Sequence, residues 1–422
     1  MLCKTQNMNK NFFSLSFIFF IFSLLACQST NFNEKNSQSK QNHFADGTEI
    51  ITVENQFEKR DTILLTFAGD LMAHSNVTRP KNFKEIYEDV KDYFLKSDFT
   101  FANLETPVLE TVDYSTYPNF NVKREYVDEA INAGINVFCL ANNHTNDQGL
   151  QGINSTRKYF EEKIKSAENS SKQIYAAGIK EKSNTPLTYQ IIEKESKFGQ
   201  TWKILFLSVT EILNRNDYSS YIDFVRPNEK TRNLFLENLK KLKAEISPDL
   251  FVLGFHCGEA EYIRTVPEKQ KEFYNQIVES GVDILWINHA HVTKSWELLS
   301  DQNGKIRKAI FYGMGNTISG QRSLPNFENP DDFWDYTGDS LLVQLRFEKT
   351  EDGIQIVQSN PVFITTYITP KYHYVIKKLD DNFLEELKLE GNIKWNKYLE
   401  ERKKLMEEIK GSVISNNDDF IY

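Results

Sequence analysis

Several residues that could bind a metal ion lie just beyond short apolar runs of this sequence. The runs are candidate β-strands, and the polar residues at their ends include five of the seven histidines together with carboxylates and amides. Imidazole, carboxylate and amide groups suit a borderline divalent cation, and no cluster of thiolates accompanies them. The residues at these ends are Asp70, His74, Asn103, Glu105, Asn143, His144, Asp147, His256, His289 and His291.

Each of these residues alone has a more ordinary explanation. A single histidine after a strand is more often a hydrogen-bonded loop residue, and an aspartate after a glycine often forms a turn. The convergence of six such loops favours a metal site instead. In an extended segment, His289 and His291 would share one side of the chain. Cys257 is not expected as a ligand, because zinc–cysteine sites normally gather several thiolates.

The elements that would position these residues alternate between strands and helices. The candidate strands are 63–68, 99–102, 137–140, 203–209, 250–255, 284–287 and 309–312. Segments with helical periodicity lie between them at 83–94, 125–132, 152–165, 231–245 and 268–280. Continuous apolar strands that alternate with helices predict an α/β fold whose sheets are covered by helices. In such folds, ligands bind at the loops beyond the carboxyl ends of the strands.

The composition is that of a sizeable globular protein. The chain has 422 residues, of which 40% are hydrophobic, and its formal net charge is −9. No stripe of Lys and Arg that could follow phosphates is present, so nucleic-acid binding is not expected. Four cysteines exclude a disulfide-stapled scaffold. Cys139 and Cys257 are expected as two buried thiols, with a bridge between them as the alternative.

The N-terminus has the features of a lipoprotein signal peptide. Lys4 and Lys10 precede an uncharged apolar run at 12–26, which is short for a membrane span of about 20 residues. Cys27 follows a small residue, in a junction that resembles the bacterial lipobox, and would be diacylated. We expect a signal peptide at 1–26, a flexible polar tether at 27–60, a folded domain at 61–350, and C-terminal strands with an amphipathic helix at 351–422.

Six stretches together resemble the CapA family of bacterial capsule synthesis proteins, the poly-γ-glutamate group within the calcineurin-like metallophosphoesterases. They are Phe67–Met72, Asp98–Pro107, Leu140–Gly149, His256–Gly258, His289–Val292 and Tyr312–Asn316. The similarity runs in order from about residue 62 to 347, and its most specific element is Asn-Asn-His-x-x-Asp-x-Gly at 142–149. The resemblance implies that the domain at 61–350 is a four-layer αββα sandwich of the metallophosphatase type, followed by a C-terminal helical appendage.

The resemblance also implies roles for individual residues. His144 resembles the family's catalytic histidine and Asp147 its partner carboxylate, with a hydrogen bond that only orders the loop as the alternative. One or two divalent cations (Mn, Zn, Fe or Mg) are implied. The implied metal ligands are Asp70, Glu105, Asn143, His256 and His289, with His291 beside them and with Asn103 and Asn316 as further candidates for the site.

Some positions depart from the pattern of ordinary metallophosphoesterases. Met72 stands where a histidine ligand is usual, and a thioether is a poor ligand for hard cations. His74, two residues further on, is a candidate substitute. The loop after His256 is one residue longer than in the family, so either Glu259 or Glu261 fills the family's acidic position.

Two kinds of function follow from these expectations. The first is a metal-dependent hydrolase that acts on a phosphoester or on a γ-linked polyglutamate-type polymer. The second is a non-catalytic lipoprotein that binds or helps to export an anionic capsule polymer. In both cases a lipid anchor would hold the protein in a membrane of the bacterial cell envelope, facing outward or into the periplasm. Other membrane proteins of capsule synthesis are expected as partners.

Overall fold

The computed structural model describes residue 57, residues 59–168 and residues 172–415. The expected signal peptide, Cys27 and most of the expected tether lie outside these residues. Within the described ranges, none of the helices combines the length and the apolar composition that a membrane crossing needs. Cys139 and Cys257 are both buried free thiols, as expected.

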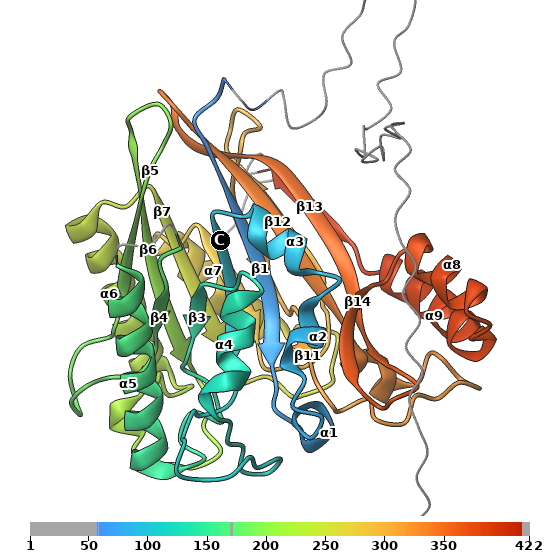
Figure 1. Ribbon diagram of the computed structural model, residues 1–422. Coiled ribbons are helices and arrows are strands. Elements are labelled where there is room, and N and C mark those ends of the chain that lie inside the picture. Colours follow the sequence, from blue (N-terminus) through green and yellow to red (C-terminus); the bar gives the residue numbers. More distant parts are fainter. Residues whose placement is uncertain (1–56, 58, 169–171, 416–422) are drawn as a thin grey trace, which may run out of the picture. The chain divides into compact units, whose positions relative to one another are not determined.

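The first sheet has eight strands and places the N-terminal strand β1 near its centre (Figure 1). The order is β14, β13, β12, β1, β2, β3 and β4, and the short strand β11 also pairs with β1. β1 is parallel to β2 and antiparallel to β12. The bounds are β1 Thr62–Leu71, β2 Phe99–Leu104, β3 Val137–Cys139, β4 Tyr175–Ala177, β11 Asn316–Ile318, β12 Asp339–Thr350, β13 Gly353–Ile368 and β14 Tyr374–Lys378.

The second sheet has seven strands, in the order β15, β9, β10, β8, β7, β6 and β5. Its central strands β6, β7, β8 and β10 are parallel, so their carboxyl ends lie at one edge. The bounds are β5 Gln190–Glu195, β6 Thr201–Thr210, β7 Leu250–His256, β8 Ile284–Asn288, β9 Trp296–Ser300, β10 Ile306–Phe311 and β15 Gly411–Ser415.

Helices cover the outer face of each sheet. The helices of the first sheet are α1 Ser75–Thr78, α2 Phe83–Tyr87, α3 Lys91–Lys96, α4 Arg124–Asn132 and α5 Gly149–Ala167, so the expected helix at 83–94 is two short helices. The helices of the second sheet are α6 Glu229–Ile246 and α7 Glu268–Glu279. The remaining helical segments are the 3₁₀ helices η2 Ser219–Tyr221 and η3 Phe333–Gly338, and the C-terminal α8 Asp381–Leu389 and α9 Ile393–Glu407.

Three layers of apolar side chains lie between the four layers of helices and sheets and hold them together. Alternate residues of β1 point to opposite faces, so Phe67 packs between the two sheets whereas Ala68 packs under the helices of the first sheet. Between the sheets, the Phe67 ring stacks on Phe101 at 4.8 Å and packs 5.9 Å from the indole of Trp286, measured between ring centroids. Phe235 and Phe273 pack α6 and α7 on the second sheet. The expected αββα sandwich is confirmed.

The C-terminal region adds strands to both sheets. β12 and β13 pair as a hairpin, and the expected boundary at residue 350 falls at its turn. β15 pairs with β9 at the edge of the second sheet. The amphipathic segment is two helices, α8 and α9, which form an apolar cluster with strand residues such as Tyr367 and Val375. Figure 1 shows these two helices beside β13 and β14, at the opposite side of the sheets from β5.

Candidate metal centre

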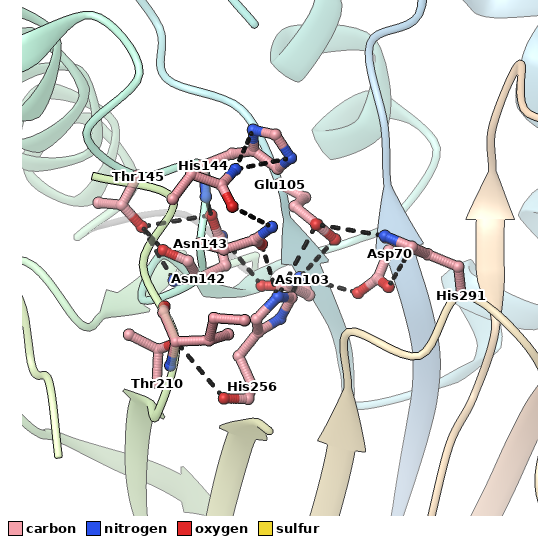
Figure 2. A network of polar contacts seen from close by, with 12 residues as sticks. Asp70, Asn103, Glu105, Asn142, Asn143, His144, Thr145, Thr210, His256 and His291 are labelled. Carbon is pink, nitrogen blue, oxygen red and sulfur yellow. Dashed lines mark hydrogen bonds and ion pairs between the residues drawn. The ribbon is translucent and has the colours of Figure 1, made fainter. Parts of the chain in front are cut away.

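The carboxyl ends of strands from both sheets meet around one cluster of polar side chains (Figure 2). Asp70 and Asn103 lie next to the last residues of β1 and β2, and Glu105 directly follows β2. From the second sheet, His256 is the last residue of β7 and His289 directly follows β8. The two sheets therefore build one site, as the position of these residues at strand ends predicts.

Overlapping groups of donor atoms lie in this cluster. One group contains Asp70, Glu105 and His291, and a second contains Glu105, His256 and His289. In each group the donor atoms lie within 4.8 Å of one another. Because Glu105 belongs to both groups, one carboxylate could serve two neighbouring cations.

The donor atoms fit a cation, because some of them are buried without a hydrogen-bonding partner. Among the described residues, Glu105 Oε1 and His289 Nδ1 are buried and accept or donate no hydrogen bond. Burial, and then the charge of Asp70, raise the pKa of Glu105 well above its usual value. Two adjacent buried carboxylates need a compensating positive charge to be ionised together. A divalent cation provides that charge.

Two imidazoles of the cluster stay in the neutral form that binds metal ions. Burial and then His289 lower the pKa of His256 well below its usual value. Burial and then His291 lower the pKa of His289 to about 3. The Asn143 side chain reaches the same group, since its Oδ1 lies 2.8 Å from His256 Nε2.

Hydrogen-bonding partners orient the remaining ligands. Asn103 donates from Nδ2 to Asp70 Oδ1 at 2.8 Å. Asn316 Nδ2 donates to the carbonyl of Thr337, so Asn316 Oδ1 must be the acceptor for His291 Nδ1, which lies 2.9 Å away. Nδ1 of His291 therefore carries the proton and Nε2 is directed to the donor group. Both asparagines contact candidate ligands and hold them in place.

Burial lowers the pKa of His291, but the hydrogen bond and the charge of Asp70 outweigh burial and raise the pKa overall. In the absence of a cation, His291 thus offsets part of the negative charge of Asp70. The two side chains lie 3.3 Å apart, from Nδ1 to Oδ2. A cation at this group would take over that electrostatic role.

Glu259 and Glu261, the two acidic residues that follow His256, have different surroundings in the structure. Glu259 is buried and pairs with Lys294, with 2.5 Å between Oε2 and Nζ, and its other oxygen accepts from the hydroxyl of Tyr274. Glu261 instead forms a third donor group with His289 and His291. Of the two alternatives, Glu261 is therefore the residue at the site.

Met72 and His74 lie outside the donor groups. Met72 is buried in the apolar layer under the helices of the first sheet. His74 precedes α1, and its Nδ1 accepts a hydrogen bond of 3.3 Å from the backbone N–H of Gly320. Among the described residues, no group of donor atoms contains His74. The group around Asp70 thus offers three candidate ligands, Asp70, Glu105 and His291.

His289 and His291 approach each other for a reason that differs from the expectation. The segment that carries them is not extended, because their φ angles are 100° and 57°, both in the left-handed region that L residues rarely adopt. The chain turns at both residues, and the ring centroids lie 5.9 Å apart. Such backbone strain persists only where the surrounding structure imposes it, as at many functional sites.

A buried pair of His144 and Asp147 lies beside the donor groups. His144 Nδ1 is 2.7 Å from Asp147 Oδ2, and the same oxygen accepts from the backbone N–H of Phe120 at 2.7 Å. Asn142 positions the loop, since its Nδ2 donates to the carbonyl of Leu104 and its Oδ1 accepts from the His144 N–H. Figure 2 shows Asn142 and His144 in one network with Asn103, Glu105 and His256.

Two residues of the site were not among the sequence candidates. Asn142 belongs to the Asn-Asn-His element, and its spacing after the apolar run at 137–140 could have indicated it. Asn214 lies in the loop after β6, and its side chain contacts both Asn143 and His144. Only its place in a loop beyond a candidate strand could have suggested it.

Comparisons with known proteins agree with this geometry. Residues 64–321 match the family model described as "Bacterial capsule synthesis protein PGA_cap". A "Capsule biosynthesis protein CapA" of Bacillus anthracis is 25% identical over 319 residues, which cover 72% of this chain and 68% of that protein. A "PGA biosynthesis protein CapA" of Bacillus subtilis (strain 168) is 25% identical over 300 residues, covering 69% of this chain and 70% of that protein.

A solved structure described as "calcineurin-like phosphoesterase YfkN from Bacillus subtilis" aligns with 81% of this chain and 99% of its own, at 10% identity and a TM-score of 0.38. The assignment of the fold rests on the four layers described above. The family match, by contrast, covers more than half of the chain and includes the strand ends that carry Asp70, Glu105, Asn143, His256 and His289. The chain belongs to the family of bacterial capsule synthesis proteins that this model describes.

Proposed function

We propose that the protein is a metal-dependent hydrolase of the bacterial cell envelope, acting on a phosphoester or on an anionic capsule polymer. The observation that carries this proposal is the buried pair of His144 and Asp147 beside the donor groups. His144 directly follows Asn143, whose Oδ1 contacts His256. In a site that only binds a polymer, this pair would serve only to order the loop.

The donor atoms define which residues would hold the cations. When bound, a divalent cation polarises a substrate oxygen and lowers the pKa of a water molecule toward neutrality. Mn, Zn, Fe and Mg are the candidates, one or two ions in number. Asp70, Glu105 and His291 would hold one ion, and Glu105, Asn143, His256 and His289 the other.

His144 would exchange a proton with the leaving group. Asp147 lies at Nδ1, so Nε2 is the ring nitrogen that remains for substrate. Asp147 cannot easily turn away, because its Oδ2 also accepts the Phe120 N–H. A fixed tautomer and a neighbouring carboxylate are what a general acid of this kind requires.

The bond that is cleaved is either a phosphoester or a γ-linked amide. The fold resembles that of phosphoesterases, whereas the name of the Bacillus subtilis relative refers to PGA biosynthesis. Removal of residues 1–26 would take away Lys4 and Lys10 and no acidic residue, which changes the net charge from −9 to −11. Such a protein repels an anionic polymer unless bound cations or a local basic patch reverse the local field. The charge balance thus supports a metal-containing site.

The proposed location rests on the sequence of the N-terminus. An apolar run followed by Ala26 and Cys27 supports a lipid anchor, with the folded domain outside the cytoplasmic membrane. Membrane proteins of capsule synthesis are the partners that we propose there.

A second candidate function is a non-catalytic lipoprotein that binds or helps to export the polymer. Met72 favours it, because this side chain lies in the apolar core where phosphoesterases usually have a ligand. The group around Asp70 has lost one ligand in this way, and a weakly held cation would suffice for binding but not for turnover.

One experiment separates the two functions. Protein purified without chelator is assayed for metal content, for turnover of a chromogenic phosphodiester and of γ-linked glutamyl oligomers, and for binding of the oligomers. The variants are His144→Ala and the double variant Asp70→Ala/His289→Ala. Turnover that is lost in both variants supports the hydrolase. Binding without turnover in metal-loaded wild type contradicts it and favours the second function.

A further inference from the structure

Asn214 joins the two sheets at the candidate site. It lies four residues beyond the end of β6, in the second sheet, and contacts the loop that follows β3 in the first sheet. Its backbone N–H donates to the carbonyl of Asn143 at 3.2 Å. Its side-chain Oδ1 accepts from Asn143 Nδ2 at 3.3 Å.

These contacts determine which way the Asn143 amide points. An amide side chain has an oxygen that accepts and an NH₂ group that donates. Because Nδ2 of Asn143 is used by Asn214, Oδ1 faces His256 and the donor atoms around it. If the Asn143 amide were reversed, its NH₂ group would face the cation. An NH₂ group donates hydrogen bonds and cannot bind a cation.

The same amide lies against the ring of His144. Asn214 Nδ2 is 3.3 Å from Nδ1 and 3.4 Å from Nε2 of that ring. A donor at nearly equal distances from both nitrogens lies over the face of the ring, not along either lone pair. Nδ1 is occupied by Asp147, whereas Nε2 has, among the described residues, no hydrogen-bonding partner besides Asn214 Nδ2.

The loop that carries Asn214 is held independently by Asn146. Asn146 Nδ2 donates to the carbonyls of Arg215 at 2.8 Å and Asp217 at 2.7 Å. Asn146 therefore orders the same loop through its backbone carbonyls, and within the described part of the chain its side chain makes no hydrogen bond with Asn143 or His144. It provides a matched control for the order of the loop.

We propose that Asn214 is a positioning residue that sets the orientation of the Asn143 amide and the plane of the His144 ring. This inference rests on the proposed function for the role of His144. The expected effect of Asn214 on metal binding, however, can be measured without turnover. Asn214 is exposed, whereas Asn143 and His144 beneath it are buried. Shortening an exposed side chain removes little core packing, so the variant reports on positioning and not on folding.

The test compares Asn214→Ala, Asn214→Asp and Asn146→Ala in the full folded chain. The affinity for Mn²⁺ or Zn²⁺ is measured by competition with a chromophoric chelator, alongside the melting temperature of the metal-free protein. In Asn214→Ala we expect metal affinity to fall by about 10-fold or more, the usual effect of removing a partner of a metal ligand, with the melting temperature unchanged. Asn214→Asp keeps the oxygen that accepts from Asn143 and should keep the affinity.

Asn146→Ala should lower the melting temperature and leave the metal affinity as in wild type. Equal losses of affinity in Asn146→Ala and Asn214→Ala would overturn the inference, because loop order alone would explain them. Wild-type affinity in Asn214→Ala would overturn it as well. Where the wild type turns over a substrate, Asn214→Asp should lower kcat with little change in KM. If it turns over none, the proposed function fails while the affinities still decide this inference.

Discussion

Nδ1 of His144 lies 2.7 Å from Oδ2 of Asp147, and both side chains are buried next to the proposed metal ligands. We expect His144→Ala to keep its metal but to lose about 10²–10⁴-fold in turnover, the usual share of general acid–base catalysis. Asp147→Asn should show a smaller loss of the same type, because it disturbs the tautomer and not the ligands. Metal content and kcat are measured on the same samples. A loss of metal in His144→Ala would mean that His144 is itself a ligand.

Glu105 belongs to two donor groups, so its removal should have the largest effect on bound metal. Glu105→Ala should lose both cations, whereas Asp70→Ala and His256→Ala should each lose the cation of their own group. Each loss should lower the melting temperature, since bound metal stabilises the folded state. Metal per chain is measured by mass spectrometry after purification without chelator. Equal metal content in the wild type and all three variants would exclude the site.

Substitution of Glu259 should affect folding stability, whereas substitution of Glu261 should affect metal binding. Glu259→Gln leaves the ammonium of Lys294 buried without its partner, which should lower the free energy of unfolding by about 3–5 kcal/mol. Its metal content should stay that of the wild type. Glu261→Gln should keep the stability of the metal-free protein and weaken metal binding instead, because Glu261 shares a donor group with His289 and His291. Denaturant unfolding and metal titration of both variants check this, and the reverse pattern would assign Glu259 to the site.

The ionised carboxylate of Asp339 should stabilise the protein at neutral pH and lose this effect at acidic pH. Burial raises the pKa of this carboxyl group, but the guanidinium groups of Arg322 and Arg402 outweigh burial and hold the pKa below its usual value. The stabilisation is therefore present above about pH 4, the unfolded pKa, and is lost as the pH falls through the folded value. Asp339→Asn should cost about 3–5 kcal/mol at neutral pH. The difference from wild type, measured by denaturant unfolding, should shrink below about pH 4, and a constant difference would contradict the charge pairing.

Lipidation should depend on Cys27. Replacing Cys27 with Ser removes the thiol that would be acylated, so the protein should leave the membrane fraction after a carbonate wash. Immunoblots of membrane and soluble fractions measure this. A variant that stays with the membranes would show that another segment holds it, most simply the uncleaved apolar run at 12–26.

The strand ends could be predicted from the sequence because the apolar runs are long and continuous. Parallel strands of one sheet bring their carboxyl ends together, so the sequence places Asp70 and Asn143 at one edge once the runs are strands. The division of the strands between two sheets could not be predicted in the same way. Strands buried on both faces have no alternation that tells which sheet they join.

Other features of the site depend on contacts between distant residues. The choice between Glu259 and Glu261 is decided by the burial of Lys294, which comes after the next strand. His289 and His291 approach each other because both have positive φ angles. The residue types in this loop do not predict such angles. Asn214 could not be singled out, because an asparagine in a polar loop has no distinctive pattern of its own.

The position of β1 between β2 and β12 also limits when the site can form. β12 pairs with β1 from Thr62–Glu348 to Phe67–Val343, so Asp70 lies at the end of a strand whose neighbour comes almost 300 residues later. Pairing between such distant segments slows folding, because a long loop must close first. The donor groups around Asp70 would therefore be complete only late in folding. A chain interrupted before β12 leaves residues 62–67 of β1 unpaired on one side, and such an open edge invites aggregation.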